Sequence, residues 1–149
     1  MLIKHKKLTI RNAVATDAEQ LCNWWNDGEV MAHAGFPSGL NTTAEAVCAE
    51  LLHDSDSSHR RHIIEFAGKA IGEMSYRNQG NETAEIGIKI CDFNYQDQGL
   101  GTTILSLFVD ALFNKYGYKR IILDTSTNNK RAQHVYQQKL GFKIVGTRQ

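Results

Sequence analysis

The hydrophobic period of this chain changes abruptly at a glycine-rich turn. Before the turn, residues 83–91 alternate apolar and polar side chains, which is the pattern of a half-buried strand. After it, apolar residues recur at helical spacing from Ile104 to Phe113. The turn itself, residues 95–102, reads YQDQGLGT. A strand, a glycine turn and a helix in this order restrict the chain to a fold that mixes sheet and helix.

The remaining patterns predict a single α/β (α+β) domain over residues 1–149, with a mixed, mostly antiparallel sheet flanked by helices. Segments 62–67 and 70–76 alternate around a tight turn, so with 83–91 they predict an antiparallel meander. Two T-x-x-E motifs read as capping boxes that open helices. The other expected elements are a strand at 8–11, helices after Thr16–Glu19 and Thr42–Glu45, a strand at 118–124, a helix at 129–140 ended by Gly141, and a strand at 142–147.

Composition narrows the class of protein. The net charge is +1, which gives no overall bias toward nucleic acid or a membrane surface, and the basic run Lys4–Lys7 reads as a solvated end. No stretch approaches the roughly 18 apolar residues of a membrane span, and no signal peptide is expected. The three cysteines are widely spaced and odd in number, which predicts free thiols in the cytoplasm. Neither cysteines nor histidines have metal-ligand spacing, so we expect no metal, nucleic-acid or membrane partner.

The glycine turn is a candidate anion site. Backbone amides at the start of a helix are unpaired and lie at the positive end of the helix dipole, where phosphate binds well. Gly99 and Gly101 lack a Cβ and let a ligand approach closely. A Walker loop is excluded because no lysine follows Gly101, and a dinucleotide fingerprint because Ile104 replaces its third glycine. Taken alone, the turn is better interpreted as structural, with no ligand.

Two motifs together resemble the GNAT superfamily of N-acetyltransferases. Gln96-x-x-Gly99-x-Gly101 resembles its motif A, [QR]-x-x-G-x-[GA], which binds the pyrophosphate of acetyl-coenzyme A. Residues 129–142, NKRAQHVYQQKLGF, resemble a second motif, N-x-x-A-x-x-x-Y-x-x-x-G-F, at the usual spacing. Weaker similarities at 25–27, 85–88 and 124–129 resemble the branch of ribosomal-protein N-terminal and aminoglycoside 6'-N-acetyltransferases.

The resemblance implies the coenzyme-binding residues and one catalytic residue. The strand before the turn is expected to offer backbone groups to the pantetheine arm and an amide to the thioester oxygen. Tyr136 is expected to protonate the leaving thiolate, although a buried aromatic role is the alternative. Asn129 is expected to contact pantetheine or to cap its own helix. The implied coenzyme-binding set is Ile88, Ile90, Gln96, Asp97, Gln98, Gly99, Leu100, Gly101, Thr102 and Asn129.

The general base and the acceptor site are less constrained. Glu85 and Asp124 are the two candidate bases, and each could instead bind a cationic acceptor or be a solvated residue. The acceptor site is expected between Trp24 and Phe36, where aromatic rings and carboxylates suit a cationic amine, although at least one tryptophan is expected in the core. The expected acceptor-binding residues are Trp25, Asp27, His33 and Phe36.

These expectations together predict an acetyl-CoA-dependent N-acetyltransferase. The acceptor would be a small cationic amine or a protein N-terminus, and the alternative is a non-catalytic sensor of acyl-CoA. Family members usually add one more strand after the G-F strand, whereas this sequence ends at Gln149. A homodimer that covers the open sheet edge is one hypothesis, which a size measurement showing only monomer at high concentration would remove.

Overall fold

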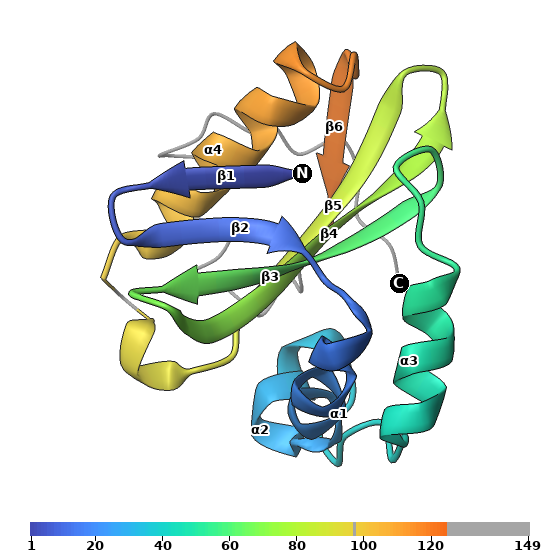
Figure 1. Ribbon diagram of the computed structural model, residues 1–149, viewed down its shortest axis with the longest axis vertical. Coiled ribbons are helices and arrows are strands. Elements are labelled where there is room, and N and C mark those ends of the chain that lie inside the picture. Colours follow the sequence, from blue (N-terminus) through green and yellow to red (C-terminus); the bar gives the residue numbers. More distant parts are fainter. Residues whose placement is uncertain (97, 125–149) are drawn as a thin grey trace.

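The structure is a computed structural model that describes residues 1–96 and 98–124, with the side chain of His33 left out. Its six strands form one sheet in the order β1-β2-β3-β4-β5-β6 (Figure 1). Neighbouring strands are antiparallel except β5 and β6, which are parallel. The expected mixed, mostly antiparallel sheet is therefore confirmed. The strands are β1 (Leu2–His5), β2 (Leu8–Asn12), β3 (His59–Phe66), β4 (Lys69–Gly80), β5 (Thr83–Ile90) and β6 (Arg120–Leu123).

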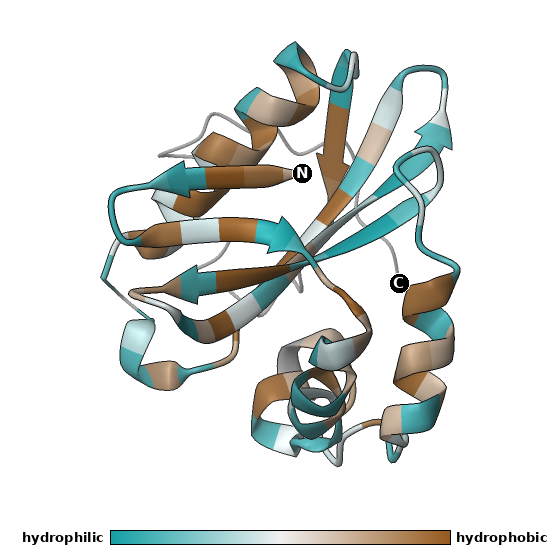
Figure 2. Ribbon diagram, in the orientation of Figure 1, coloured by the Kyte–Doolittle hydropathy of each residue, from teal (hydrophilic) through white to brown (hydrophobic). Residues whose placement is uncertain are grey.

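Helices pack on both faces of this sheet, and the hydrophobic residues run along the strands and along α4 (Figure 2). Phe108 and other apolar residues of α4 form the larger core with β2 to β5. Leu21 of α1 and Val47 of α3 form a second core on Ile63 of β3. The helices are α1 (Ala18–Asn26), α2 (Gly28–Met31), α3 (Ala44–Leu52) and α4 (Leu100–Asn114), with 3-10 turns at Ala15–Asp17, Ala32–Ala34 and Phe93–Tyr95.

The N-terminal strand β1 was missing from the sequence prediction. Lys4 and His5 are exposed, as expected of a solvated end, yet they belong to a strand that pairs with β2. Ile3 pairs with Ile10 and packs against the larger core, which explains why the strand forms. The meander is confirmed, with β3 beginning earlier and β4 ending later than expected.

Both capping-box predictions were wrong in detail. The first helix begins at Ala18 without a side-chain cap, because a 3-10 turn precedes it and Asp17 instead pairs with Arg11 at 2.8 Å. The second helix begins at Ala44, and its cap is Thr43, whose hydroxyl accepts from the Ala46 amide at 3.1 Å. Both helices exist, but their N-caps are each shifted by one residue, to Asp17 and Thr43.

One buried histidine joins the sheet to α4. The His62 ring is fully buried between Tyr76 and Phe108, with ring centroids 5.7 and 5.1 Å away. Its Nδ1 lies 3.2 Å from the Met74 carbonyl oxygen, so Nδ1 carries the proton, whereas Nε2 has no hydrogen-bond partner among the described residues. Burial lowers the pKa of His62 to about 4. The His62 ring is therefore neutral in the folded protein.

Acidification is expected to destabilise the protein through His62. Between pH 6.5 and 4 the unfolded chain binds a proton at this histidine that the folded chain does not, so stability falls as pH falls. The loss is at most about 3 kcal/mol over this window. Urea unfolding of wild type and His62→Phe between pH 4 and 7 measures it, and the variant should show the shallower pH slope. Equal slopes would contradict this assignment.

Candidate functional site

The second half of β5 continues beyond the end of β6. The parallel pairing of the two strands ends where Ile86 faces Leu123. Within the described residues, 87–90 therefore pair only with β4, and their other edge faces no strand. Such an edge leaves backbone hydrogen-bonding groups available to a ligand.

The direction of the backbone identifies the groups on this open edge. The Cys91 amide donates to the Ile71 carbonyl of β4 at 2.8 Å. Successive residues of a strand point their polar groups to opposite edges, so the amides of Ile88 and Ile90 point away from β4. Their side chains meanwhile pack against the larger core. The backbone amides that Ile88 and Ile90 are expected to offer to a coenzyme thus lie on the open edge.

The glycine turn begins directly after this edge and leads into α4. Gly99 has φ +77° and is the N-cap of α4, with no side chain capping the helix. Leu100, Gly101 and Thr102 form the first turn, whose amides have no partner within the helix. Gln96 connects the turn to β5, since its Nε2 donates to the Ile90 carbonyl at 2.9 Å. Gln96 thus ties the segment before α4 to the end of the open edge.

The two glycines of the turn fit a ligand that approaches the backbone closely. A Cβ on Gly99 or Gly101 would meet no described atom within 4 Å. Gly99 needs glycine for its left-handed conformation, but Gly101 is an ordinary helical residue. A glycine within a helix lowers stability by about 1 kcal/mol relative to alanine. In the described residues neither the packing nor the backbone angle at position 101 requires a glycine. The open space is what a phosphate group in contact with these amides needs.

The expected acceptor-binding residues lie on the α1–α2 segment. Trp25 is 7% exposed, and its indole N–H donates to Glu73 Oε2 at 2.6 Å. Asp27 caps α2 by accepting from the Glu29 amide at 2.9 Å. Phe36 is 46% exposed, in the loop after the 3-10 turn that contains His33. Trp25 is therefore a packed residue, as expected for at least one tryptophan, and the acceptor roles of these four residues stay predictions.

Glu73 was not singled out from the sequence. It lies on β4 opposite Lys89, whose Nζ is 3.5 Å from Oε1, and it anchors the Trp25 indole. Arg61 lies over the same indole, 5.7 Å from the ring. The sequence feature that could have identified Glu73 is a charged residue inside the apolar strand AIGEMSY. In the structure it lies on the face of the sheet opposite Ile71 and Met74. The pairing with Trp25, 48 residues away, carries no local sequence signal.

The two candidate bases lie on either side of the place where β5 and β6 part. Glu85 is half-buried on β5, opposite Arg77 of β4 and Ile122 of β6. Its side chain lies on the face of the sheet that α1 and α3 cover, whereas Ile86 lies on the other face, in the larger core. Asp124 is exposed and directly follows the last residue of β6. Both carboxylates therefore border the open edge, and which of them is the base is not decided by this geometry.

The remaining expected site residues, Asp97, Asn129 and Tyr136, lie outside the described residues, as do the expected helix at 129–140 and strand at 142–147. Among residues 1–96 and 98–124, no group of three or more histidine, cysteine or acidic side chains is placed to hold a metal. No helix in the same part of the chain is long and apolar enough to cross a membrane.

Comparison with known families matches residues 7–143 to the model of the acetyltransferase (GNAT) domain. The chain belongs to the GNAT acetyltransferase family. This confirms the family and the enzyme class that the two motifs predicted. The comparison with curated proteins gave no match.

Solved structures of acetyltransferases share the fold. A GNAT-family acetyltransferase from Streptococcus pneumoniae is 26% identical with a TM-score of 0.76, over 93% of this chain and 86% of that one. Spermidine N-acetyltransferase from Vibrio cholerae, in complex with CoA and spermine, is 24% identical with a TM-score of 0.76, over 90% and 80%. Aminoglycoside acetyltransferase AAC(6')-Ib, in complex with coenzyme A, is 23% identical with a TM-score of 0.77, over 95% and 87%. The two ligand-bound neighbours carry coenzyme A, which agrees with the coenzyme expected from the glycine turn.

Proposed function

We propose that this enzyme transfers an acetyl group from acetyl-CoA directly to a primary amine, on a small cationic molecule or on a protein N-terminus. The observation that carries the proposal is the open first turn of α4, which follows an edge of β5 that pairs with no strand of the described residues. A pyrophosphate on the amides of Gly99 to Thr102 would direct a pantetheine arm along that edge. The spermidine and aminoglycoside enzymes of the same fold act on amines, which supports the acceptor class.

The chain's own residues supply the remaining chemistry in this proposal. Acetyl-CoA brings a thioester, which an amine can attack once the amine is neutral. The Ile90 amide would stabilise negative charge on the thioester oxygen. Glu85 or Asp124 would take the proton from the amine, directly or through water. Tyr136 would return a proton to the thiolate, since a phenol pKa near 10 makes this transfer nearly balanced.

The test of the function is release of free CoA thiol from acetyl-CoA against a panel of amines. The panel should hold a diamine, an aminoglycoside and a peptide with a free N-terminus. Thiol release with one class would establish the transferase and its acceptor. Saturable binding of acetyl-CoA without thiol release on any amine would favour the alternative, a non-catalytic acyl-CoA sensor.

Two isosteric variants should separate the candidate bases. Glu85→Gln and Asp124→Asn each keep size and remove charge. We expect the variant of the true base to lose roughly tenfold or more in kcat, with loss of the rising limb of the pH profile. A carboxylate that only binds the acceptor should raise KM instead and keep that limb. Unchanged kcat and KM in both variants would contradict a catalytic role for either carboxylate.

A further inference from the structure

Gly87 is an exposed glycine in the interior of a strand that has neighbours on both sides. It lies in β5 at the first residue of the open edge 87–90, and it pairs with Ser75 of β4. A Cβ at this position would meet only Ser75 Oγ among the described residues, at 3.8 Å, and the φ of Gly87 is outside the left-handed region. Neither packing nor backbone angle therefore requires a glycine here, although glycine weakens the interior of a strand.

Gly72 on the adjacent strand shows the contrast. A Cβ on Gly72 would overlap the carbonyl oxygen of Lys89, so packing explains that glycine. A strand glycine without such a reason marks a place where a ligand or another backbone comes close. Within the described part of the chain, no backbone atom beyond its two chain neighbours lies within 4 Å of the Cβ position of Gly87. The close approach that Gly87 permits is therefore left to a ligand.

The side chains around Gly87 leave a low strip across this face of the sheet. Successive residues of a strand alternate between faces, so Glu85, Gly87 and Lys89 share the face opposite α4. Their partners on β4 are, in the same order, Arg77, Ser75 and Glu73. Long side chains thus stand at both ends, and the two short residues form the floor of what we call the Gly87 strip. Along β5 the flanking residues are about 13 Å apart, from four steps of about 3.3 Å.

The two ends of the Gly87 strip differ in how their charges are paired. At one end Lys89 Nζ lies 3.5 Å from Glu73 Oε1, so these two charges compensate each other. At the other end Arg77 lies 3.3 Å from His59 Nδ1 rather than on Glu85. Glu85 forms no hydrogen bond or ion pair with the rest of the described residues. Its carboxylate therefore stays available to an amine.

The floor of the strip offers van der Waals contact rather than hydrogen bonds. Backbone N–H and C=O groups of a strand lie in the plane of the sheet, toward a neighbouring strand or the open edge, and not up from its face. Ser75 Oγ is the one polar side-chain atom between the flanking residues. Methylene groups match such a floor, whereas the N–H and C=O groups of a peptide would gain no backbone partners on it.

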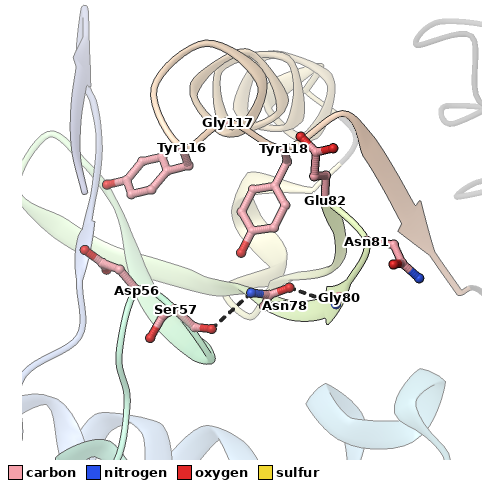
Figure 3. Close-up of a pocket in the computed structure, with 9 residues that line it drawn as sticks. All are labelled: Asp56, Ser57, Asn78, Gly80, Asn81, Glu82, Tyr116, Gly117 and Tyr118. Atoms are coloured by element: carbon pink, nitrogen blue, oxygen red, sulfur yellow. Dashed lines mark hydrogen bonds between the residues drawn. The ribbon is translucent and has the colours of Figure 1, made fainter.

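A separate pocket of about 340 Å³ lies between the β4–β5 hairpin and the residues that follow α4 (Figure 3). This hairpin is at the start of β5, whereas the open edge is at its end. Polar groups of the pocket are engaged within the chain, since Asp56 pairs with Arg60 at 2.9 Å and Asn78 donates to the Ser57 carbonyl at 3.1 Å. The Gly87 strip, and not this pocket, therefore adjoins the place expected for the thioester.

We propose that Gly87 is a specificity-determining residue, because the carbon chain next to the reacting amine of the acceptor lies against it. The proposal rests on the transferase function proposed above, with acetyl-CoA along the open edge. The amine then lies between the thioester and Glu85, and its first methylene groups pass over Gly87. The strip selects amines carried by an unbranched methylene chain over the α-branched amine of a protein N-terminus.

The test uses a bisubstrate analogue, in which a CH2–CO–NH linkage joins the sulfur of coenzyme A to a butyl chain that ends in a primary amine. Calorimetric titration compares it with acetyl-CoA in wild type, Gly87→Ala and Gly87→Val. We expect the wild type to bind the analogue roughly tenfold more tightly than acetyl-CoA, the gain from burying about two methylene groups. Gly87→Ala should lose part of this gain and Gly87→Val all of it, with the affinity for acetyl-CoA unchanged.

Ser75→Ala is the matched control, because it keeps the floor low and should keep the gain. Thermal unfolding should show that each variant is folded. The inference is overturned, with the transferase function intact, if the wild type binds acetyl-CoA but gains nothing from the chain, or if Gly87→Val keeps the gain. It is also overturned if Gly87→Val weakens acetyl-CoA itself, since Gly87 would then contact the coenzyme. A folded wild type that binds neither ligand would overturn both proposals.

Discussion

Replacing Gly101 with valine is expected to weaken acetyl-CoA binding by at least about 100-fold, from loss of two hydrogen bonds to charged oxygens at about 1.5 kcal/mol each. The new side chain would occupy open space beside the first turn of α4, where a Cβ would meet no described atom from outside the helix within 4 Å. A phosphate could then no longer reach the amides of Gly101 and Thr102. Calorimetric titration of the purified variant with acetyl-CoA measures the loss.

Thermal unfolding of Gly101→Val is the control for an effect on folding. Gly101 is helical, so its substitution should leave thermal unfolding nearly unchanged. Gly99→Ala should differ, because the left-handed φ of +77° costs an alanine about 1 kcal/mol of stability. A Gly101→Val protein that is folded and binds acetyl-CoA as tightly as wild type would show that the glycine turn does not hold the coenzyme.

Gly72→Ala is expected to destabilise the protein by about 3 kcal/mol, the upper range for overpacking a rigid site. Gly72 is buried on β4 and pairs with Ile90, and a Cβ there would overlap the carbonyl oxygen of Lys89. Backbone cannot move aside as a flexible side chain can, so β4 and β5 must separate at this point. Urea unfolding measures the change, and the displaced Ile90 amide should also lower the rate of acetyl transfer.

Gly87 is the matched control in the adjacent strand. Its φ is not in the left-handed region, and among the described residues a Cβ there would meet only Ser75 Oγ, at an ordinary contact distance of 3.8 Å. Gly87→Ala should therefore be neutral or stabilise the protein by a few tenths of a kcal/mol, since glycine weakens a strand interior. Equal destabilisation by the two substitutions would contradict the steric explanation for Gly72.

Local periodicity was sufficient to predict most of the sheet and helices. The alternation in 83–91 and the helical spacing after Ile104 are both strong because each element buries one face on the larger core. β1 escaped prediction because it has four residues, of which Ile3 packs against the larger core while Leu2, Lys4 and His5 are exposed. The exact start of α1 was missed because Asp17 has a tertiary partner, Arg11, that competes with the local cap.

A candidate coenzyme site could be proposed from the sequence because its expected residues are contiguous. The turn at 96–102 and the end of β5 follow one another in sequence, so one motif identifies both. The expected acceptor residue Trp25 instead contacts a segment that is distant in sequence. The Trp25–Glu73 hydrogen bond and the ion pair of Glu73 with Lys89 depend on how α1 lies on the sheet, which no local pattern reveals.

The central claim is that the open amides of the glycine turn hold acetyl-CoA. Its most direct test is calorimetric titration of the folded protein with acetyl-CoA, with 3'-dephospho-acetyl-CoA and free pantetheine as companion ligands. The claim predicts saturable one-to-one binding that survives loss of the 3'-phosphate and falls steeply when the pyrophosphate is absent. A folded sample that binds no acetyl-CoA, or that binds pantetheine as tightly as the full coenzyme, would contradict it.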